Sequence, residues 1–265
     1  MKPLLLRLMN RFITFVRQLF TILAPLGLTA CSALHSSRPA NDDVAFASPD
    51  HVTAVYTNGD VIVHWQNHAR ADGGNWVEFS TPGSEYIKLQ VSLNDRPVDT
   101  FLHPRVAPAT EFIYHVQPFF GQATEPVKVV TGETPEKATS LEDGPIAGMT
   151  NRTTSPKVSI RTMQTFSEAT PRDLTATLPE PTVVDLCWSD TVSDESGWLV
   201  EWKPSATDLF IVCALLPADT TSFRKTQLPA QTTSWFRVRP YFDAKPSETA
   251  SVLTPPELIS PAPIR

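Results

Sequence analysis

Few side chains in this sequence are spaced so that they could hold a metal ion. Among the histidines, only His64 and His68 have a spacing that would place two ligands on one face of a helix. The residues around them alternate between apolar and polar types, as in a β-strand, so we interpret the histidines as surface residues. A second group, Asp190, Asp194 and Glu195, forms an acidic loop that could bind Ca²⁺ weakly. Acidic turn residues are common without an ion, so we predict no metal site and no cofactor.

Residue patterns typical of catalysis are also absent from the sequence. It contains no Gly-x-Ser-x-Gly nucleophile elbow, no His-Glu-x-x-His metal motif and no phosphate-binding glycine loop. We therefore predict that the protein is not an enzyme. A glycan-active enzyme is the alternative, but the repeats described below occupy nearly all of the chain and leave no room for a catalytic domain.

The first 31 residues combine a basic leader, an apolar run and a cysteine. The leader has four basic residues and no acidic ones: Lys2, Arg7, Arg11 and Arg17. The apolar run, from about Leu19 to Ala30, is short for a segment that crosses a bilayer. This order of features is typical of a secretory signal peptide.

The end of this leader, Leu28-Thr29-Ala30-Cys31, resembles the lipobox of bacterial lipoproteins. The resemblance implies that residues 1–30 are a signal peptide, that the Cys31 thiol carries a diacylglycerol, and that the new N-terminus is acylated, for example with palmitate. Two or three acyl chains give stable anchoring without a transmembrane helix. Ser32 follows where some Gram-negative lipoproteins have an inner-membrane retention Asp, which favours the outer membrane of the cell envelope. The alternatives are an ordinary secretory signal, a signal anchor, and a start at Met9.

Charge and composition limit which partners the protein can bind and which fold class it can adopt. Removing the leader leaves 18 basic against 28 acidic side chains, a formal net charge of −10. An acidic chain without a basic run is a poor partner for nucleic acid, so we predict none. The chain has 25 prolines and 10 glycines, and short apolar alternations replace long amphipathic helical stretches. This pattern favours short strands joined by turns and extended segments, hence an all-β protein.

An internal repeat organises most of the sequence. The segment 61–65, which ends in Trp65, matches 184–188, which ends in Trp188, and the run 110–120 matches 232–242. The offset is 123 residues in the first pair and 122 in the second, so a single gap relates the two copies. Self-similarity at a fixed offset indicates duplicated domains.

Each repeat resembles a fibronectin type III domain. The matching features are a proline before the first strand, a core tryptophan ending the second, an aromatic–aliphatic third strand, and a run with a proline and a threonine that leads into the sixth. They occur as Pro49, Trp65, Val77, Phe79 and 106–110, and again as Pro171, Trp188, Val200, Trp202 and 228–232. The resemblance implies two antiparallel immunoglobulin-like β-sandwiches, each of about seven strands. The family's corner tyrosine is replaced by Phe112 and Ser234, so we expect that corner to be weaker, especially in the second repeat.

The repeats set the predicted domain boundaries. We expect a tether over 31–47, domains over 48–133 and 170–255, a flexible linker over 134–169, and a proline-rich tail over 256–265. Within the linker, 158–161 alternates briefly and could add a strand to a sheet edge. Cys187 and Cys213 should lie on different sheets, which disfavours a disulfide between them, although an oxidising envelope would permit one.

Period-two alternation also predicts which side chains point away from the cores. If Val77 and Phe79 face inward, Trp76 faces outward beside the outward residues of the sixth strand. Exposed aromatic and arginine side chains are enriched at binding surfaces. The candidate binding residues for a protein or glycan partner are Trp76, Ile113, His115, Trp235, Arg237 and Arg239. Alternatively, they stack on one another and stiffen the sheet.

These features together predict a non-enzymatic surface lipoprotein. The membrane is its first expected partner, through the lipid on Cys31, and an unidentified protein or glycan is the second. The family resemblance implies an interaction or adhesion module. The alternative is a structural spacer in an envelope assembly, because fold alone does not give function.

Overall fold

The structure, a computed structural model, describes residues 48–68, 72–95, 98–133, 141–146 and 170–256. All of these residues belong to one unit, 40–265. The leader, Cys31 and the tether lie outside the described residues, as do the segment 158–161 and nearly all of the tail. None of the described segments forms a helix long and apolar enough to cross a membrane.

The described chain is all-β, as predicted, and every named strand pair is antiparallel. The first repeat supplies β1 (Asp50–Thr57), β2 (Asp60–Gln66), β3 (Gly73–Ser80), β4 (Ile87–Leu93), β5 (Thr100–His103), β6 (Glu111–Phe120) and β7 (Val127–Val130). The second supplies β8 (Arg172–Glu180), β9 (Val183–Ser189), β10 (Gly197–Lys203), β11 (Ile211–Leu216), β12 (Ser222–Lys225), β13 (Thr233–Asp243) and β14 (Ala250–Leu253).

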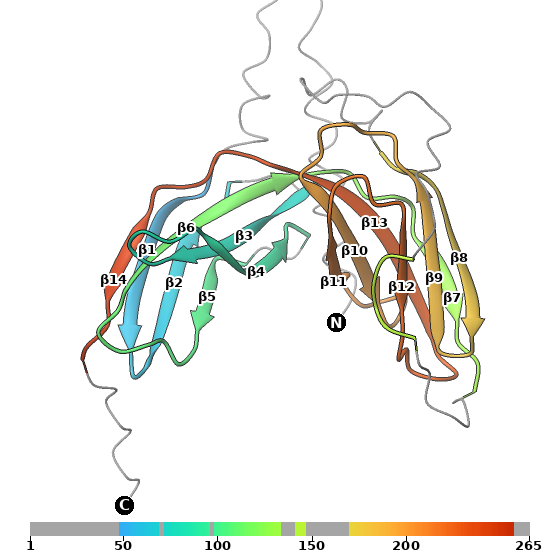
Figure 1. Ribbon diagram of the computed structural model, residues 1–265, viewed down its shortest axis with the longest axis horizontal. Coiled ribbons are helices and arrows are strands. Elements are labelled where there is room, and N and C mark those ends of the chain that lie inside the picture. Colours follow the sequence, from blue (N-terminus) through green and yellow to red (C-terminus); the bar gives the residue numbers. More distant parts are fainter. Residues whose placement is uncertain (1–47, 69–71, 96–97, 134–140, 147–169, 257–265) are drawn as a thin grey trace, which may run out of the picture. The chain divides into compact units, whose positions relative to one another are not determined.

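Two sandwiches are built from these strands (Figure 1). In the first, the sheet β1-β2-β5 packs on the β4-β3-β6 sheet, and in the second β8-β9-β12 packs on β11-β10-β13. This is the immunoglobulin-like order that the sequence predicts. The β1–β2 hairpin closes on Asn58 and Gly59, whose φ angles of 52° and 96° suit a tight two-residue turn.

The predicted core residues lie inside. Trp65 and Trp188 are 5% and 3% exposed, and each sits among apolar side chains from both sheets of its own sandwich. Along β2, Val61, Val63 and Trp65 are buried while Ile62 and His64 are not, which confirms the alternation. Each sandwich therefore has its own hydrophobic core.

The last strand of each repeat departs from the predicted contiguous domains. β7 pairs with β13 of the second repeat, and β14 pairs with β6 of the first. In Figure 1, β14 completes the sandwich that contains β1 and β6, and β7 completes the one that contains β13. The sequence boundaries 48–133 and 170–255 thus mark the repeats, while each sandwich takes one strand from the other repeat.

Part of the segment predicted to be a flexible linker is docked on the second sandwich. Gly144 forms an antiparallel bridge with Arg224 on β12, through hydrogen bonds of 3.0 and 2.7 Å. The Asp143 carboxylate accepts hydrogen bonds from the Lys225 ammonium and from the backbone and hydroxyl of Thr226. Burial by itself raises the pKa of Asp143. The hydrogen bonds from Lys225 and Thr226 and the Lys225 charge outweigh burial and lower the pKa below its ordinary value.

The two described cysteines lie on different sheets, as predicted, and are not joined to each other by a disulfide. Cys187 lies on β9 and Cys213 on β11. Burial raises the pKa of the Cys213 thiol to about 12, so this group is a thiol at neutral pH.

Candidate functional site

The residues predicted to form an exposed binding face lie on the expected side of their strands, but several of them are buried. Trp76 is 3% exposed, His115 7% and Arg239 5%. The prediction of their exposure is wrong because side chains from the other strands and the other repeat cover them. Ile113, Trp235 and Arg237 are half-buried. Whether any of them binds a partner stays a prediction.

Trp76 belongs to a cluster formed by both repeats, which we call the junction cluster. Its buried members are Trp76, Leu93, Phe119, Leu199 and Tyr241. The Trp76 ring lies 5.0 Å from Phe119 and 5.4 Å from Tyr241, and its Nε1 donates a hydrogen bond of 3.1 Å to Asp243. The Lys88 ammonium lies 4.2 Å from the centre of the same ring. The face predicted to bind a partner is therefore used to join the repeats.

His115 lies in a buried charge cluster of the first sandwich. Its Nε2 is 2.6 Å from a carboxylate oxygen of Glu78, and Lys88 is 3.2 Å from the other. Tyr86 stacks on the His115 ring at 3.9 Å. Burial by itself raises the pKa of Glu78, but the hydrogen bond to His115 and the Lys88 charge outweigh it and lower the pKa. The interpretation of the histidines as surface residues fails for this one.

The second sandwich repeats this arrangement with different basic side chains. Glu201 is fully buried and forms ion pairs with Arg237 and Arg239. Arg237 also reaches Asp95 of the first repeat at 3.3 Å, and Arg239 donates to the Gly121 carbonyl at 2.5 Å. Glu78 and Glu201 occupy equivalent positions, as do His115 and Arg237. Sequence alternation placed these side chains on the correct face but gave no sign that a buried carboxylate would receive them.

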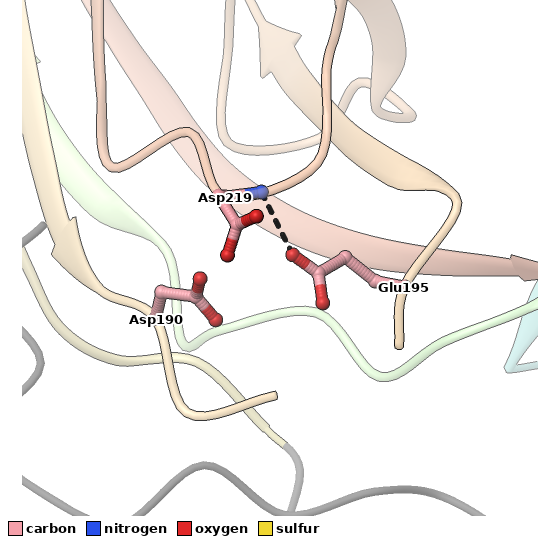
Figure 2. Close-up of side chains that lie close together, drawn as sticks. All are labelled: Asp190, Glu195 and Asp219. Carbon is pink, nitrogen blue, oxygen red and sulfur yellow. Dashed lines mark hydrogen bonds between the residues drawn. The ribbon is translucent and has the colours of Figure 1, made fainter. Parts of the chain in front are cut away.

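An acidic cluster is the group in the described chain that most resembles a metal site. Carboxylate oxygens of Asp190, Glu195 and Asp219 lie within 4.8 Å of one another. Figure 2 shows the three carboxylates turned toward one another, with Glu195 accepting a hydrogen bond of 2.9 Å from the Asp219 backbone N–H. Asp190 is fully buried and accepts from the Val192 N–H at 3.0 Å. Asp219, rather than the predicted Asp194, completes the group.

This cluster offers the oxygen ligands that Ca²⁺ takes in proteins, but one oxygen from each of its three residues supplies only part of the six to eight oxygens of a usual site. Asp219 follows a short turn after β11 and has φ of 59°, a conformation that Asp tolerates better than most residues. The turn is visible in the sequence, whereas its closeness to the 190–195 loop is not. That the chain binds no metal stays a prediction.

Comparisons with known proteins give structural similarity only. No protein-family model matches the chain, and no curated protein matches its sequence. Among solved structures, a two-domain fibronectin type III segment of chicken tenascin is 12% identical, with a TM-score of 0.25, and covers 78% of this chain and 100% of its own. The FN1–FN3 domains of chicken CNTN1 are 16% identical, cover 79% and 66%, and give a TM-score of 0.25. The central fibronectin III array of RIM-binding protein is 15% identical, covers 75% and 60%, and gives 0.26.

Proposed function

We propose that this protein is a non-enzymatic lipoprotein of the bacterial cell envelope, whose two sandwiches act as a structural spacer. The observation that supports this role best is the junction cluster, in which the side chains predicted to bind a partner pack between the repeats. A spacer must keep its modules together. Aromatic and charged side chains that pack between the two repeats hold them together.

The attachment in this proposal is a lipid on Cys31. It is supported by the basic leader, the short apolar run and the lipobox-like Leu28-Thr29-Ala30-Cys31. Ser32 in the next position supports sorting to the outer membrane. The tether 31–47 would then connect the acylated cysteine to β1.

Membrane fractionation tests the attachment directly. The full-length chain should incorporate labelled palmitate and pellet with membranes, whereas Cys31→Ser should lose the label and move to the soluble fraction. Cys187→Ser is the matched control, because it removes a thiol but keeps the lipobox, and it should behave as the wild type. Equal labelling of the wild type and Cys31→Ser would refute the anchor.

An interaction role is the second candidate function. It is favoured by Trp235, which is half-buried on β13 with the Lys203 ammonium 5.5 Å from its ring centre, so part of the ring is available to a ligand. Affinity capture from the native envelope with wild type and Trp235→Ala would distinguish the roles. A partner lost only in the variant supports binding at this face, and unchanged capture supports the spacer.

A further inference from the structure

The exchanged strands suggest how the two repeats are held together. β7 and β14 cross between the repeats, and we propose that this crossing within one chain locks the two sandwiches into a single unit. The inference deepens the spacer function proposed above, because a spacer with exchanged strands cannot separate at the linker between its repeats. The pairing itself does not depend on lipid attachment, so the two proposals can fail independently.

Equivalent strands make the exchange nearly symmetric. β7 pairs Lys128 with Trp235, and β14 pairs Ser251 with Ile113. Trp235 and Ile113 are equivalent positions of the two repeats, so Lys128 and Ser251 are equivalent as well. A conventional hairpin would instead pair Lys128 with Ile113, and Ser251 with Trp235. The exchanged and the hairpin arrangements therefore use the same strands with different partners.

The crossing segments, residues 121–126 and 244–249, make matching contacts with the opposite repeat. Thr124 donates its N–H to the Val238 carbonyl at 2.9 Å, and its hydroxyl accepts from the Val238 N–H at 3.2 Å. Ser247 does the same with Val116, both at 2.9 Å. Val116 and Val238 are equivalent positions, so a hydroxyl residue in each crossing segment closes the same pair of backbone hydrogen bonds.

The two crossing segments also share a feature of their sequence. Each contains a proline, Pro126 or Pro246, which holds the residue before it in an extended conformation. Between the two crossings, β6 and β13 pair at their ends, where the Phe120 and Phe242 rings stack at 5.2 Å. This contact joins the end of β6 to the end of β13 across the two repeats.

Each exchanged strand contributes to the core that it joins. Val129 of β7 is 4% exposed within the core of the second sandwich. Val252 of β14 packs against the core of the first. Exchange of equivalent elements is a known low-cost way to join two folded units. Here both units belong to one chain, so each repeat gives its last strand to the other sandwich and receives one in return.

Disulfide trapping in the full-length chain distinguishes the two arrangements. In a background with Cys31, Cys187 and Cys213 replaced by alanine, four cysteine substitutions are combined in pairs: Ile113→Cys, Lys128→Cys, Trp235→Cys and Ser251→Cys. Directly opposed strand positions suit disulfide geometry. We expect Lys128→Cys/Trp235→Cys and Ile113→Cys/Ser251→Cys to form intrachain bridges at least about tenfold faster than the hairpin pairs.

The hairpin pairs, Ile113→Cys/Lys128→Cys and Trp235→Cys/Ser251→Cys, are matched controls because they contain the same four substitutions. Faster bridging of the hairpin pairs would overturn the proposal. Bridging of the exchanged pairs only between chains, seen as a dimer on a non-reducing gel, would also overturn it, because the strands would then join two copies. The background lacks Cys31, so the result is independent of lipid attachment.

Discussion

The third strand of each sandwich carries a buried glutamate that pairs with basic side chains of neighbouring strands. In the first sandwich Glu78 receives His115 and Lys88, and in the second Glu201 receives Arg237 and Arg239. Buried charges are tolerated only when they are paired, because desolvation is costly. The two positions are equivalent in the repeat, which indicates a shared way of filling this face of the sheet.

Removing the first of these carboxylates should have a pH-dependent effect. Glu78→Gln should lower the free energy of unfolding by about 1.5–3 kcal/mol at pH 7, the range for a hydrogen bond to a charged group. The folded-state pKa of Glu78 lies below the ordinary value of 4.5, so its stabilisation is complete above that value and is lost as pH falls through the folded pKa. The difference between wild type and variant should therefore shrink below about pH 4.

Urea denaturation between pH 3 and pH 7 provides the measurement. Glu111→Gln is the control, because Glu111 is exposed at the start of β6 and should show little difference at any pH. An equally large effect of Glu78→Gln at pH 3 and pH 7 would contradict the assignment of a charged, paired glutamate.

For single residues, the sequence predicted the direction of a side chain better than it predicted what surrounds that side chain. Period-two alternation correctly placed Val77 and Phe79 toward the core and Trp76 on the opposite face. It could not predict that Phe119 and Tyr241 would cover Trp76, because that contact depends on strands far apart in the chain. The alternation showed only that such side chains point away from the core of their own sandwich. It did not show that they are exposed to solvent.

Among the elements, β6 and β13 meet at a junction where the backbones of the two repeats approach closely. Gly121 follows β6 directly, and a Cβ at this position would lie 1.8 Å from the Pro240 carbonyl oxygen. The backbones of the two repeats approach closely here because glycine has no side chain.

Substitution of this glycine should weaken the crossing. We expect Gly121→Ala to lower the free energy of unfolding by about 1–3 kcal/mol, as overpacking does. Gly83→Ala is the matched control, since its Cβ would meet nothing within 4 Å and the cost comes only from its φ of +82°. Denaturant unfolding of the two variants compares the effects, and a Gly121→Ala protein as stable as the wild type would argue against close packing at the junction.

The repeat in the sequence was sufficient to predict both sandwiches, but the strand exchange was not predictable from it. The segments 127–130 and 250–253 are both short and β-prone, so each suits the sixth strand of either repeat. The similarity of the two repeats reveals the duplication. For the same reason, the sequence does not show whether each last strand pairs with the sixth strand of its own repeat or of the other. Pro126 and Pro246 favour an extended residue before them but suit a turn equally well, so they do not reveal the exchange.

In the whole molecule, we propose an N-terminal lipid and two sandwiches that are joined to each other. The anchor is a prediction from residues 28–31 alone, since these residues lie outside the described structure. The joining rests on strand pairing and on the junction cluster. Together they form the proposal of a spacer whose second repeat would stay attached to the membrane through the first.

The most direct test of this account is to cut the chain between its repeats while it is on the membrane. A specific protease site is inserted within residues 147–169 of the full-length protein, and membranes are collected after cleavage. The C-terminal fragment lacks Cys31, yet the account predicts that it pellets with the membrane and is released only by denaturant. Release of that fragment without denaturant, while the N-terminal fragment stays bound, would contradict it.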